Sequence, residues 1–184
     1  MKITSGKYKY RNIEVPRGIR PTTEKVREAI FSMIMAWIPD AEVLDLFAGS
    51  GAMGLEALSR GAARCTFVES NRQNQKVLQA NIDNCGAGGV SRVVGRDFTA
   101  ALSEIAGSDK KTRFDVVIID PPYEKKDFYD TAMLLLQEYG LIDSATIVVC
   151  EHLYDNKLLD TYQNLQKIKE KKYGTIGVDV FSVL

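Results

Sequence analysis

The sequence contains few of the residues that form disulfides or hold structural metals. It has three cysteines, Cys65, Cys85 and Cys150, and a single histidine, His152. The cysteines are odd in number and far apart, which argues against a disulfide framework. A zinc site needs a close set of cysteine and histidine ligands, and the sequence has no such set. We therefore expect a protein without a metal.

Long apolar runs are also missing. No segment approaches the roughly 18 to 20 consecutive apolar residues that a membrane-spanning helix needs. The N-terminus lacks the charged, apolar and small-residue pattern of a signal peptide. With 184 residues, of which 45% are apolar, the chain has the size and composition of one globular domain with a full core. These features predict a soluble cytoplasmic protein, which we expect to be a monomer.

The charged residues balance over the whole chain but not along it. There are 24 basic and 24 acidic residues, yet residues 1–27 contain eight basic residues against only Glu14 and Glu24. This segment is therefore near +6 and the remainder near −6. Such a segment is typical of docking on a polyanion such as nucleic acid, although a solvated, poorly ordered terminus would carry the same charge. The basic residues are Lys2, Lys7, Lys9, Arg11, Arg17, Arg20, Lys25 and Arg27.

Within this segment, basic and aromatic residues alternate. Tyr8 and Tyr10 are interleaved with three basic residues. The alternation predicts a short strand with one cationic face and one aromatic face, a shape that suits phosphate contacts. We divide the chain into a basic extension at residues 1–21 and a main domain at residues 22–184. The candidate nucleic-acid contacts are Lys7, Lys9, Arg11 and Arg20.

From the end of the basic segment onward, helical patterns alternate with short apolar runs. The first helical pattern has Thr22 or Thr23 as its N-cap. The alternation predicts an α/β fold, with a mostly parallel sheet covered by helices on both faces. The helical patterns lie at residues 20–37, 52–61, 71–84, 98–106 and 125–138. The predicted strands lie at residues 42–47, 64–69, 90–95, 114–119, 145–152, 164–171 and 175–183.

The stretch VLDLFAGSGAMG, residues 43–54, places three glycines between a predicted strand and a predicted helix. Gly49, Gly51 and Gly54 match the G-x-G-x-x-G pattern of dinucleotide-binding turns. The pattern alone is weak, because glycines allow a tight turn without naming the ligand. Asp45 would repel a pyrophosphate and could accept hydrogen bonds from a cationic amino-acid group. The turn therefore favours a ligand that presents a carboxylate to the helix N-terminus.

Two further acids follow the next two predicted strands. Glu69 closes the second strand, 18 residues after Gly51, where a carboxylate can accept both hydroxyls of an adenosine ribose. Asp97 follows the third strand and could accept from an adenine amino group, with Phe98 covering the ring. The alternatives are a solvated acid for Glu69 and a helix N-cap for Asp97.

Taken together, these motifs resemble a known family. DLFAGSGAMGLEALSRGA, the acid at the next strand end, GRDF and DPPY look like the Class I S-adenosylmethionine-dependent methyltransferases that act on exocyclic amines. The opening ITSGKYKYRNIEVPRGIRPTTEKVREAIF resembles that of the small-subunit ribosomal RNA guanine-N2 methyltransferases, the RsmD family. The resemblance covers nearly the whole chain, and the joined RPTTEKVREAIF and FAGSGAMGLEALSRGA segments are its most particular part.

The resemblance implies a fold, a cofactor and a substrate. The fold would be Rossmann-like, with seven strands of which the last is antiparallel. The cofactor would be S-adenosyl-L-methionine, and the substrate a guanine N2 amine in 16S ribosomal RNA, either free or within an assembled small-subunit particle. The implied cofactor-binding residues are Asp45, Phe47, Gly49, Gly51, Glu69 and Asp97. The implied target-base residues are Asp120, Pro121, Pro122 and Tyr123.

The chemistry of DPPY, residues 120–123, suits an amine. An exocyclic base nitrogen shares its lone pair with the ring, so it is a poor nucleophile until acceptors hold its hydrogens. Asp120 supplies one acceptor and the carbonyl of Pro121 another, on a backbone that proline makes rigid. Tyr123 offers a face on which a flipped-out base can stack, worth about 1–3 kcal/mol. An ordinary Asp-Pro turn is the alternative.

The base is less firmly indicated than the amine. Guanine presents N1–H and its N2 amine side by side, and Asp120 as an acceptor-only carboxylate can take both. Methylation of adenine N6 in RNA or DNA is an alternative, because adenine-N6 enzymes also carry DPPY. A non-catalytic RNA-binding domain would leave DPPY and Glu69 unexplained. An NAD-dependent oxidoreductase would need a hydride-transfer site that the sequence does not offer.

Overall fold

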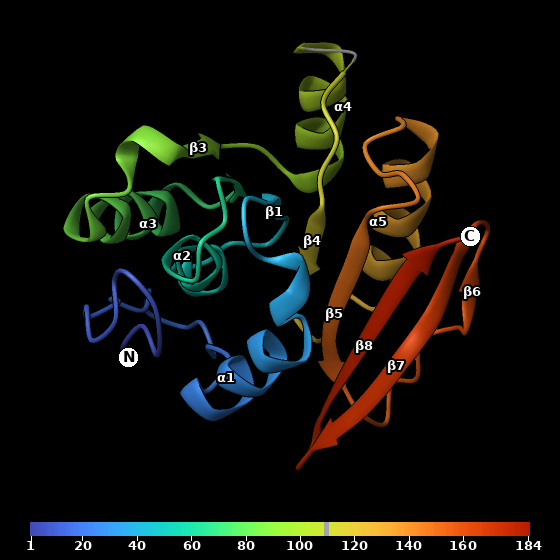
Figure 1. Cartoon of the computed structure of the whole chain (residues 1–184), viewed down its shortest axis with the longest axis horizontal. Helices are drawn as coiled ribbons and strands as arrows, with labels where there is room; N and C mark the ends of the chain where they lie inside the picture. Colours follow the sequence, from blue (N-terminus) through green and yellow to red (C-terminus); the bar gives the residue numbers. More distant parts are fainter. Residues whose placement is uncertain (109–110) are drawn as a thin grey trace.

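The computed structural model describes residues 1–108 and 111–184 and contains one eight-stranded sheet (Figure 1). The strand order is β3-β2-β1-β4-β5-β8-β7-β6. Its parallel strands are β1 (Glu42–Asp45), β2 (Arg64–Val68), β3 (Ser91–Val94), β4 (Val116–Ile119) and β5 (Ile147–Leu153). Antiparallel pairing continues the sheet through β8 (Ile176–Val183), β7 (Leu165–Tyr173) and β6 (Thr161–Tyr162). The predicted α/β class is confirmed, with a mixed sheet.

The expected seven-stranded sheet is wrong in its strand number. The additional strand, β6, is only two residues long and pairs with the start of β7. Two residues produce no periodicity in a sequence, so the pattern did not reveal it. The tight turn after β7, with Gly174 at φ 64°, folds β8 back between β5 and β7. The antiparallel part of the sheet therefore comprises three strands rather than the last one alone.

Five α-helices accompany the strands in the described part of the chain. No helix among the described residues combines the length and apolar character that crossing a membrane requires. The side chain of Thr23 caps the first helix by accepting from the backbone N–H of Val26 at 3.2 Å, as predicted. The helices are α1 (Glu24–Met33), α2 (Ala52–Ser59), α3 (Arg72–Cys85), α4 (Phe98–Ser108) and α5 (Asp127–Glu138).

Two hydrophobic cores cover the two faces of the sheet. One core packs the sheet against α1, α2 and α3, and the other packs it against α4 and α5 (Figure 1). In β4, Val116 and Ile118 face the first core, whereas Val117 and Ile119 face the second. A central parallel strand buried on both faces needs apolar residues at every position. This explains why the run before DPPY is continuously apolar.

The basic N-terminal segment is not the alternating strand that we predicted. Residues 5–10 form a bend and a turn, and Lys2 pairs with Asn12 in an isolated antiparallel bridge. Tyr8 is buried in the first core together with Ile3 and Ile13, whereas Tyr10 is 69% exposed with φ at 71°. The prediction failed because one of the two tyrosines contributes to the core.

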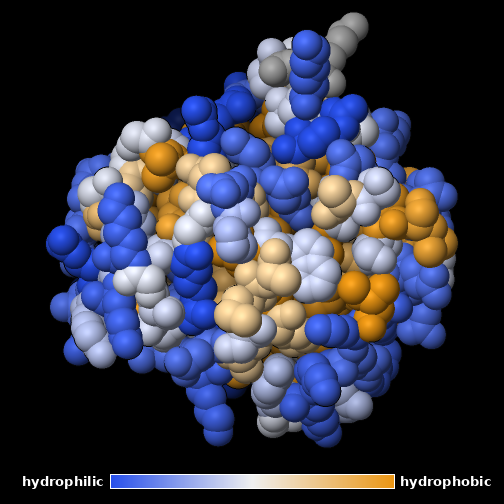
Figure 2. Space-filling view, viewed as in Figure 1, coloured by the Kyte–Doolittle hydropathy of each residue, from blue (hydrophilic) through white to orange (hydrophobic). Residues whose placement is uncertain are grey.

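Hydrophilic side chains lie over much of the periphery of the face shown in Figure 2, with apolar side chains nearer its middle.

A buried carboxylate fixes this segment to the body of the protein. Glu56 in α2 accepts hydrogen bonds from the backbone N–H and hydroxyl of Thr4, at 3.0 and 2.6 Å. It also pairs with Arg27 at 3.1 Å and Arg60 at 2.8 Å. Arg27, which is fully buried, donates in turn to the carbonyl of Lys2. Burial raises the pKa of Glu56, but these hydrogen bonds and the nearby charges outweigh it and lower the pKa below its ordinary value.

We expect Glu56→Ala to lower the free energy of unfolding by about 3–5 kcal/mol, because it leaves Arg27 buried without its counter-ion. Urea denaturation followed by Trp37 fluorescence measures this change. The matched control is Arg64→Ala, which removes an exposed pair with Glu42 and should change stability by less than about 0.5 kcal/mol. Equal losses in the two variants would show that Glu56 does not anchor the segment.

Candidate active site

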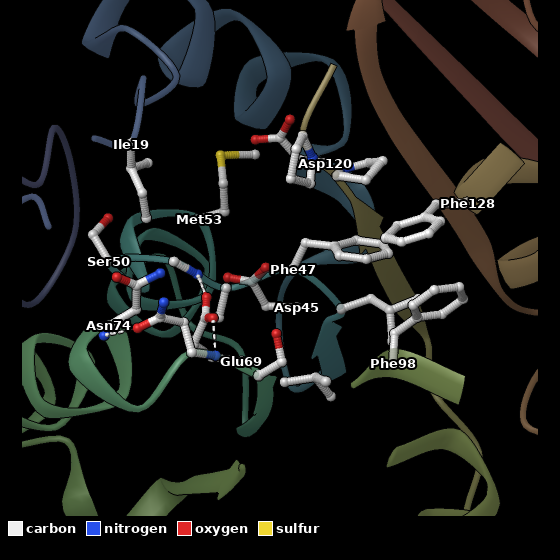
Figure 3. A pocket seen from close by; sticks show the side chains of 18 of the residues that line it. Ile19, Asp45, Phe47, Ser50, Met53, Glu69, Asn74, Phe98, Asp120 and Phe128 are labelled. Atoms are coloured by element: carbon white, nitrogen blue, oxygen red, sulfur yellow. Dashed lines mark hydrogen bonds between the residues drawn. The ribbon is translucent and has the colours of Figure 1, made fainter. Parts of the chain in front are cut away.

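A cavity of about 710 Å³ lies at the carboxyl ends of β1, β2, β3 and β4. This is the edge of an α/β sheet where ligands bind, close to the point where the strand order reverses between β1 and β4. Residues 18–22, which precede α1, line another part of the cavity. The side chains that face it come from five separate parts of the chain (Figure 3). The structure therefore unites the predicted strand-end motifs in one place.

The glycine turn between β1 and α2 forms one wall of the cavity. Gly49 and Gly51 have φ values of 54° and 80°, in the left-handed region that favours glycine. A Cβ atom on Gly51 would approach the side chain of Leu78 to 2.4 Å. The third glycine has a packing role, since a Cβ on Gly54 would lie 2.3 Å from Phe67. Gly49 thus brings the backbone to the cavity. Gly51 and Gly54 do not line it and instead allow Leu78 and Phe67 to pack closely, which holds α2 close to β2.

Asp45 ends β1 and lines the cavity, although its side chain is almost fully buried. One of its oxygens, Oδ2, accepts from the backbone N–H of Gly54 at 3.0 Å. Burial raises its pKa to about 7; the Gly54 hydrogen bond opposes this rise, and the charge of Glu69 adds to it. Asp45 therefore titrates near neutrality, and a cation in the cavity would favour its charged form.

Glu69 follows β2 and is held by the backbone on both of its oxygens (Figure 3). Its Oε2 accepts from the N–H of Gly49 at 2.9 Å and its Oε1 from the N–H of Asn71 at 2.8 Å. Each carboxylate oxygen has a second lone pair. The carboxylate is thus fixed in orientation and can still accept hydrogen bonds from a ligand in the cavity. It is more than the solvated acid of the alternative interpretation.

Asp97 follows β3 and caps α4. Its Oδ1 accepts from the N–H groups of Thr99 and Ala100, both at 3.1 Å, and from the Thr99 hydroxyl at 2.5 Å. These hydrogen bonds lower its pKa. Asp97 is therefore the N-cap of α4, as the alternative interpretation held, and its Oδ1 atom makes the capping hydrogen bonds. Asp97 also lines the cavity, so a contact with a ligand stays a prediction.

Three phenylalanines form an apolar wall beside Asp97. The ring centroids of Phe47 and Phe98 are 5.1 Å apart, those of Phe98 and Phe128 4.8 Å, and those of Phe47 and Phe128 5.9 Å. All three residues line the cavity (Figure 3). Sequence reasoning identified Phe47 and Phe98 but not Phe128. Its position in the first turn of α5, just after DPPY, was the available signal.

The DPPY segment closes the cavity at the end of β4. Asp120 and Pro121 line it, and Tyr123 stands half-buried beside them. The segment turns tightly, with the N–H of Lys125 donating to the carbonyl of Pro122 at 2.8 Å. Burial of the Asp120 carboxyl raises its pKa well above the ordinary value, and the charges of neighbouring acids raise it further. The turn alternative describes the backbone, but the turn also aims an acid into the cavity.

Sequence reasoning missed two polar residues at this end of the cavity. Thr22 was considered as a helix N-cap, but its hydroxyl instead lies 2.7 Å from Glu151 Oε2 and 3.3 Å from Asp120 Oδ2. Glu151 lies within β5 and also receives the hydroxyl of Tyr123, at 3.2 Å from its Oε1. The Glu-His pair that interrupts an otherwise apolar strand was the signal for Glu151.

The cavity is acidic overall. Its lining includes five acids, Asp45, Glu69, Asp97, Asp120 and Glu124, against two basic residues, Arg20 and Arg96. Such an environment favours a ligand with positive charge.

Of the four basic residues proposed to contact nucleic acid, only Arg20 lines the cavity. Lys7 and Lys9 lie on the turn of the N-terminal segment, each near the ring of the tyrosine that follows it. Arg11 donates to the carbonyl of Asn84 at 3.1 Å. The structure therefore separates the basic turn from the cavity, with residues 12–22 connecting them.

Comparisons with known proteins agree over almost the entire chain. The model of a family described as Conserved hypothetical protein 95 matches residues 1–182. Ribosomal RNA small subunit methyltransferase D of Escherichia coli K12 is 36% identical over 183 residues, which cover 98% of this chain and 89% of that protein.

Solved structures also match. That of a hypothetical protein of Thermus thermophilus is 29% identical and superposes with a TM-score of 0.85, covering 100% of this chain and 99% of that one. An RNA methyltransferase from Salinibacter ruber in complex with S-adenosyl-L-homocysteine shares the fold, with a TM-score of 0.67 at 14% identity over 89% of this chain and 94% of that one. The chain therefore belongs to the Conserved hypothetical protein 95 family, which is the RsmD family that its motifs resemble.

Proposed function

We propose that this protein transfers a methyl group from S-adenosyl-L-methionine to the N2 amine of a guanine in small-subunit ribosomal RNA. The observation that carries the proposal is the cavity in which the glycine turn, Asp45, Glu69 and Asp120 meet. In this proposal, the cavity joins a cofactor site and an amine-binding site. Membership of a family with named ribosomal RNA small subunit methyltransferases supports methyl transfer to small-subunit ribosomal RNA.

The charge of the cavity suits this cofactor. S-adenosylmethionine carries a sulfonium and an ammonium group, and the acidic lining suits both. Asp45 would accept from the ammonium, and Glu69, fixed by Gly49 and Asn71, would accept from the ribose hydroxyls. The Phe47, Phe98 and Phe128 wall would cover the adenine ring, with Asp97 within reach of its amino group. When bound, the cofactor supplies a methyl group that is already activated on sulfur.

The residues of DPPY would prepare the nucleophile. Asp120 and the Pro121 carbonyl would hold the hydrogens of the target amine and let its nitrogen become tetrahedral. Tyr123 would stack on the flipped-out base. Because alignment lowers the barrier without a strong base, the chain needs mainly to orient the amine towards the methyl group. Guanine fits Asp120 best, since N1–H and N2–H can both donate to one carboxylate.

The basic extension, residues 1–21, would bring the RNA to this site. Lys7 and Lys9 are exposed on its turn, and Arg20 lies where the segment reaches the cavity. Phosphate contacts of this kind position a substrate without reading its sequence. The enzyme would act as a monomer, on free RNA or on an assembled particle.

The affinity for S-adenosylmethionine should rise as the pH increases through about 7, because Asp45 must be ionised to hold a cation. Below that pH a bound cation has to displace its proton. Asp45→Asn should weaken binding about 10-fold or more and flatten this pH dependence. Calorimetric titration at several pH values tests both effects. Glu42→Gln, at the exposed start of the same strand, is the control; an unchanged pH dependence in Asp45→Asn would refute the assignment.

Asp120→Asn should lower kcat about 100-fold or more, because it removes the charge that the amine hydrogens approach as the transition state forms. Cofactor affinity should stay within a few-fold of wild type. The assay follows a labelled methyl group into small-subunit ribosomal RNA from cells that lack this protein, with the product mapped by mass spectrometry. Asp127→Asn, an exposed acid in the first turn of α5, is the control. Full activity in Asp120→Asn, or methyl groups on adenine N6, would contradict the proposal.

The double variant Lys7→Glu, Lys9→Glu should bind ribosomal RNA more weakly, and the slope of log affinity against log salt should become shallower by up to about two units. Arg11 is left in place because it binds Asn84. The control is Lys169→Glu, Lys171→Glu on β7, which changes net charge equally at another exposed site. Identical losses in the two double variants would mean that total charge, rather than the basic extension, governs binding.

A further inference from the structure

Glu151 is a buried acid that the mechanism above does not use. It lies in β5 with 4% of its surface exposed, beside the strand that carries Asp120. Its two oxygens receive the hydroxyls of Thr22 and Tyr123, and its backbone carbonyl receives the hydroxyl of Tyr129 at 2.6 Å. A buried carboxylate with several hydroxyl partners is held in one place. The place is the end of the cavity where the target amine would lie.

The single hydrogen of Thr22 cannot satisfy both acids that it contacts. Its Oγ1 lies 2.7 Å from Glu151 Oε2 and 3.3 Å from Asp120 Oδ2. A hydroxyl donates one hydrogen and accepts with its lone pairs, whereas an ionised carboxylate can only accept. With the Thr22 hydrogen directed to the nearer Glu151, a favourable contact with Asp120 requires a proton on Asp120. The geometry therefore favours one proton shared between the two acids.

The surroundings of the two acids also favour a single shared proton. Burial raises the pKa of both acids, and the charge of Glu151 adds to the rise at Asp120. Asp45, at the end of the neighbouring strand, also faces Asp120, and its charge opposes the ionisation of Asp120. The other titratable or charged groups around the pair, from the N-terminal segment, the DPPY turn, α5 and β5, are Arg20, Tyr123, Tyr129, Cys150 and His152.

We propose that Asp120 and Glu151 form a carboxyl pair that holds one proton, joined through the hydroxyl of Thr22, and that Glu151 stores this proton while Asp120 holds the target amine. The inference rests on the proposed function of Asp120. It assigns roles to two residues outside the motifs: Glu151 as the proton reserve and Thr22 as the bridge. Tyr123 links the pair to the base by donating to Glu151 at 3.2 Å.

The proton movements balance at each step. In the free protein, Asp120 donates its proton to Thr22, and Thr22 donates to Glu151. When the amine arrives, the Asp120 proton passes to Thr22 and the Thr22 proton passes to Glu151. Asp120 becomes the carboxylate that accepts the amine hydrogens, and the charge of the pair does not change. After methyl transfer, an N–H bond of the cationic nitrogen breaks, its electrons stay on nitrogen, and Asp120 takes the proton. The pair then returns one proton to water at the open cavity.

Carbon-13 NMR of the side-chain carboxyl groups tests the pair in the cofactor-free protein. We expect the Asp120 and Glu151 resonances to titrate together in two steps. Glu151→Gln, which keeps the shape of the side chain, should leave a single Asp120 titration step. That step should lie at least about one pH unit below the upper step of the wild type, because a neighbouring charge is lost. Glu138→Gln, at an exposed position in α5, should leave the titration unchanged. An Asp120 titration that is the same in wild type and Glu151→Gln would overturn the proposal.

Kinetic measurements test the bridging role of Thr22, because a purely structural role would not make kcat depend on its hydroxyl. Thr22→Val should lower kcat about 10-fold or more without changing cofactor affinity, and Thr22→Ser, which keeps a hydroxyl, should retain most activity. Equal kcat values in Thr22→Val and Thr22→Ser would refute the bridge, and so provide a second test if Glu151→Gln does not fold.

The controls separate this inference from the proposed function. An inactive wild type, or a fully active Asp120→Asn, would reject the methyl-transfer proposal. If the wild type methylates its RNA and Asp120→Asn does not, an Asp120 NMR titration that is unmoved in Glu151→Gln rejects only the carboxyl pair.

Discussion

The parallel pairing of β1, β2, β3 and β4 is the constraint on which the site depends. Parallel strands all present their carboxyl ends at the same edge of a sheet, so the residues that follow them must lie close together. In this chain those residues are the glycine turn, Glu69, Asp97 and DPPY. They are separated by dozens of positions in the sequence and form one cavity. The apolar strands thus determine where the acids stand, and the acids determine which ligands fit.

Crowding acids at that edge costs stability and gives the site its chemistry. Burial disfavours the charged form of a carboxyl group, and neighbouring carboxylates disfavour it further. The pKa of Asp45 is consequently raised to about 7, and those of Asp120 and Glu151 are raised as well. These carboxyl groups become ready acceptors only when a cationic group or a hydrogen-bond donor approaches. An acidic cavity of this kind suits a cationic cofactor and an amine better than it suits a phosphate.

The N-terminal segment contributes to the site as well as carrying positive charge. Glu56 holds Thr4 and Arg27, and Ile3, Tyr8 and Ile13 lie in the main core. Its later residues, 18–22, line the cavity and bring Thr22 between Asp120 and Glu151. The basic turn and the cavity are thereby connected through a short, anchored stretch of chain. An RNA held by the turn would have its path to DPPY restricted by that stretch.

The sequence by itself determined the α/β class, the glycine turn, the acids at the strand ends and DPPY, because each depends on a local pattern of period or composition. It mispredicted a strand around Tyr8 and seven strands in the sheet, because burial and a two-residue strand leave no such pattern. Only the tertiary structure decided that Phe128 joins the aromatic wall and that Thr22 lies between Asp120 and Glu151. These contacts join residues up to 129 positions apart, and the distance between such residues is set by how the sheet and the N-terminal segment pack.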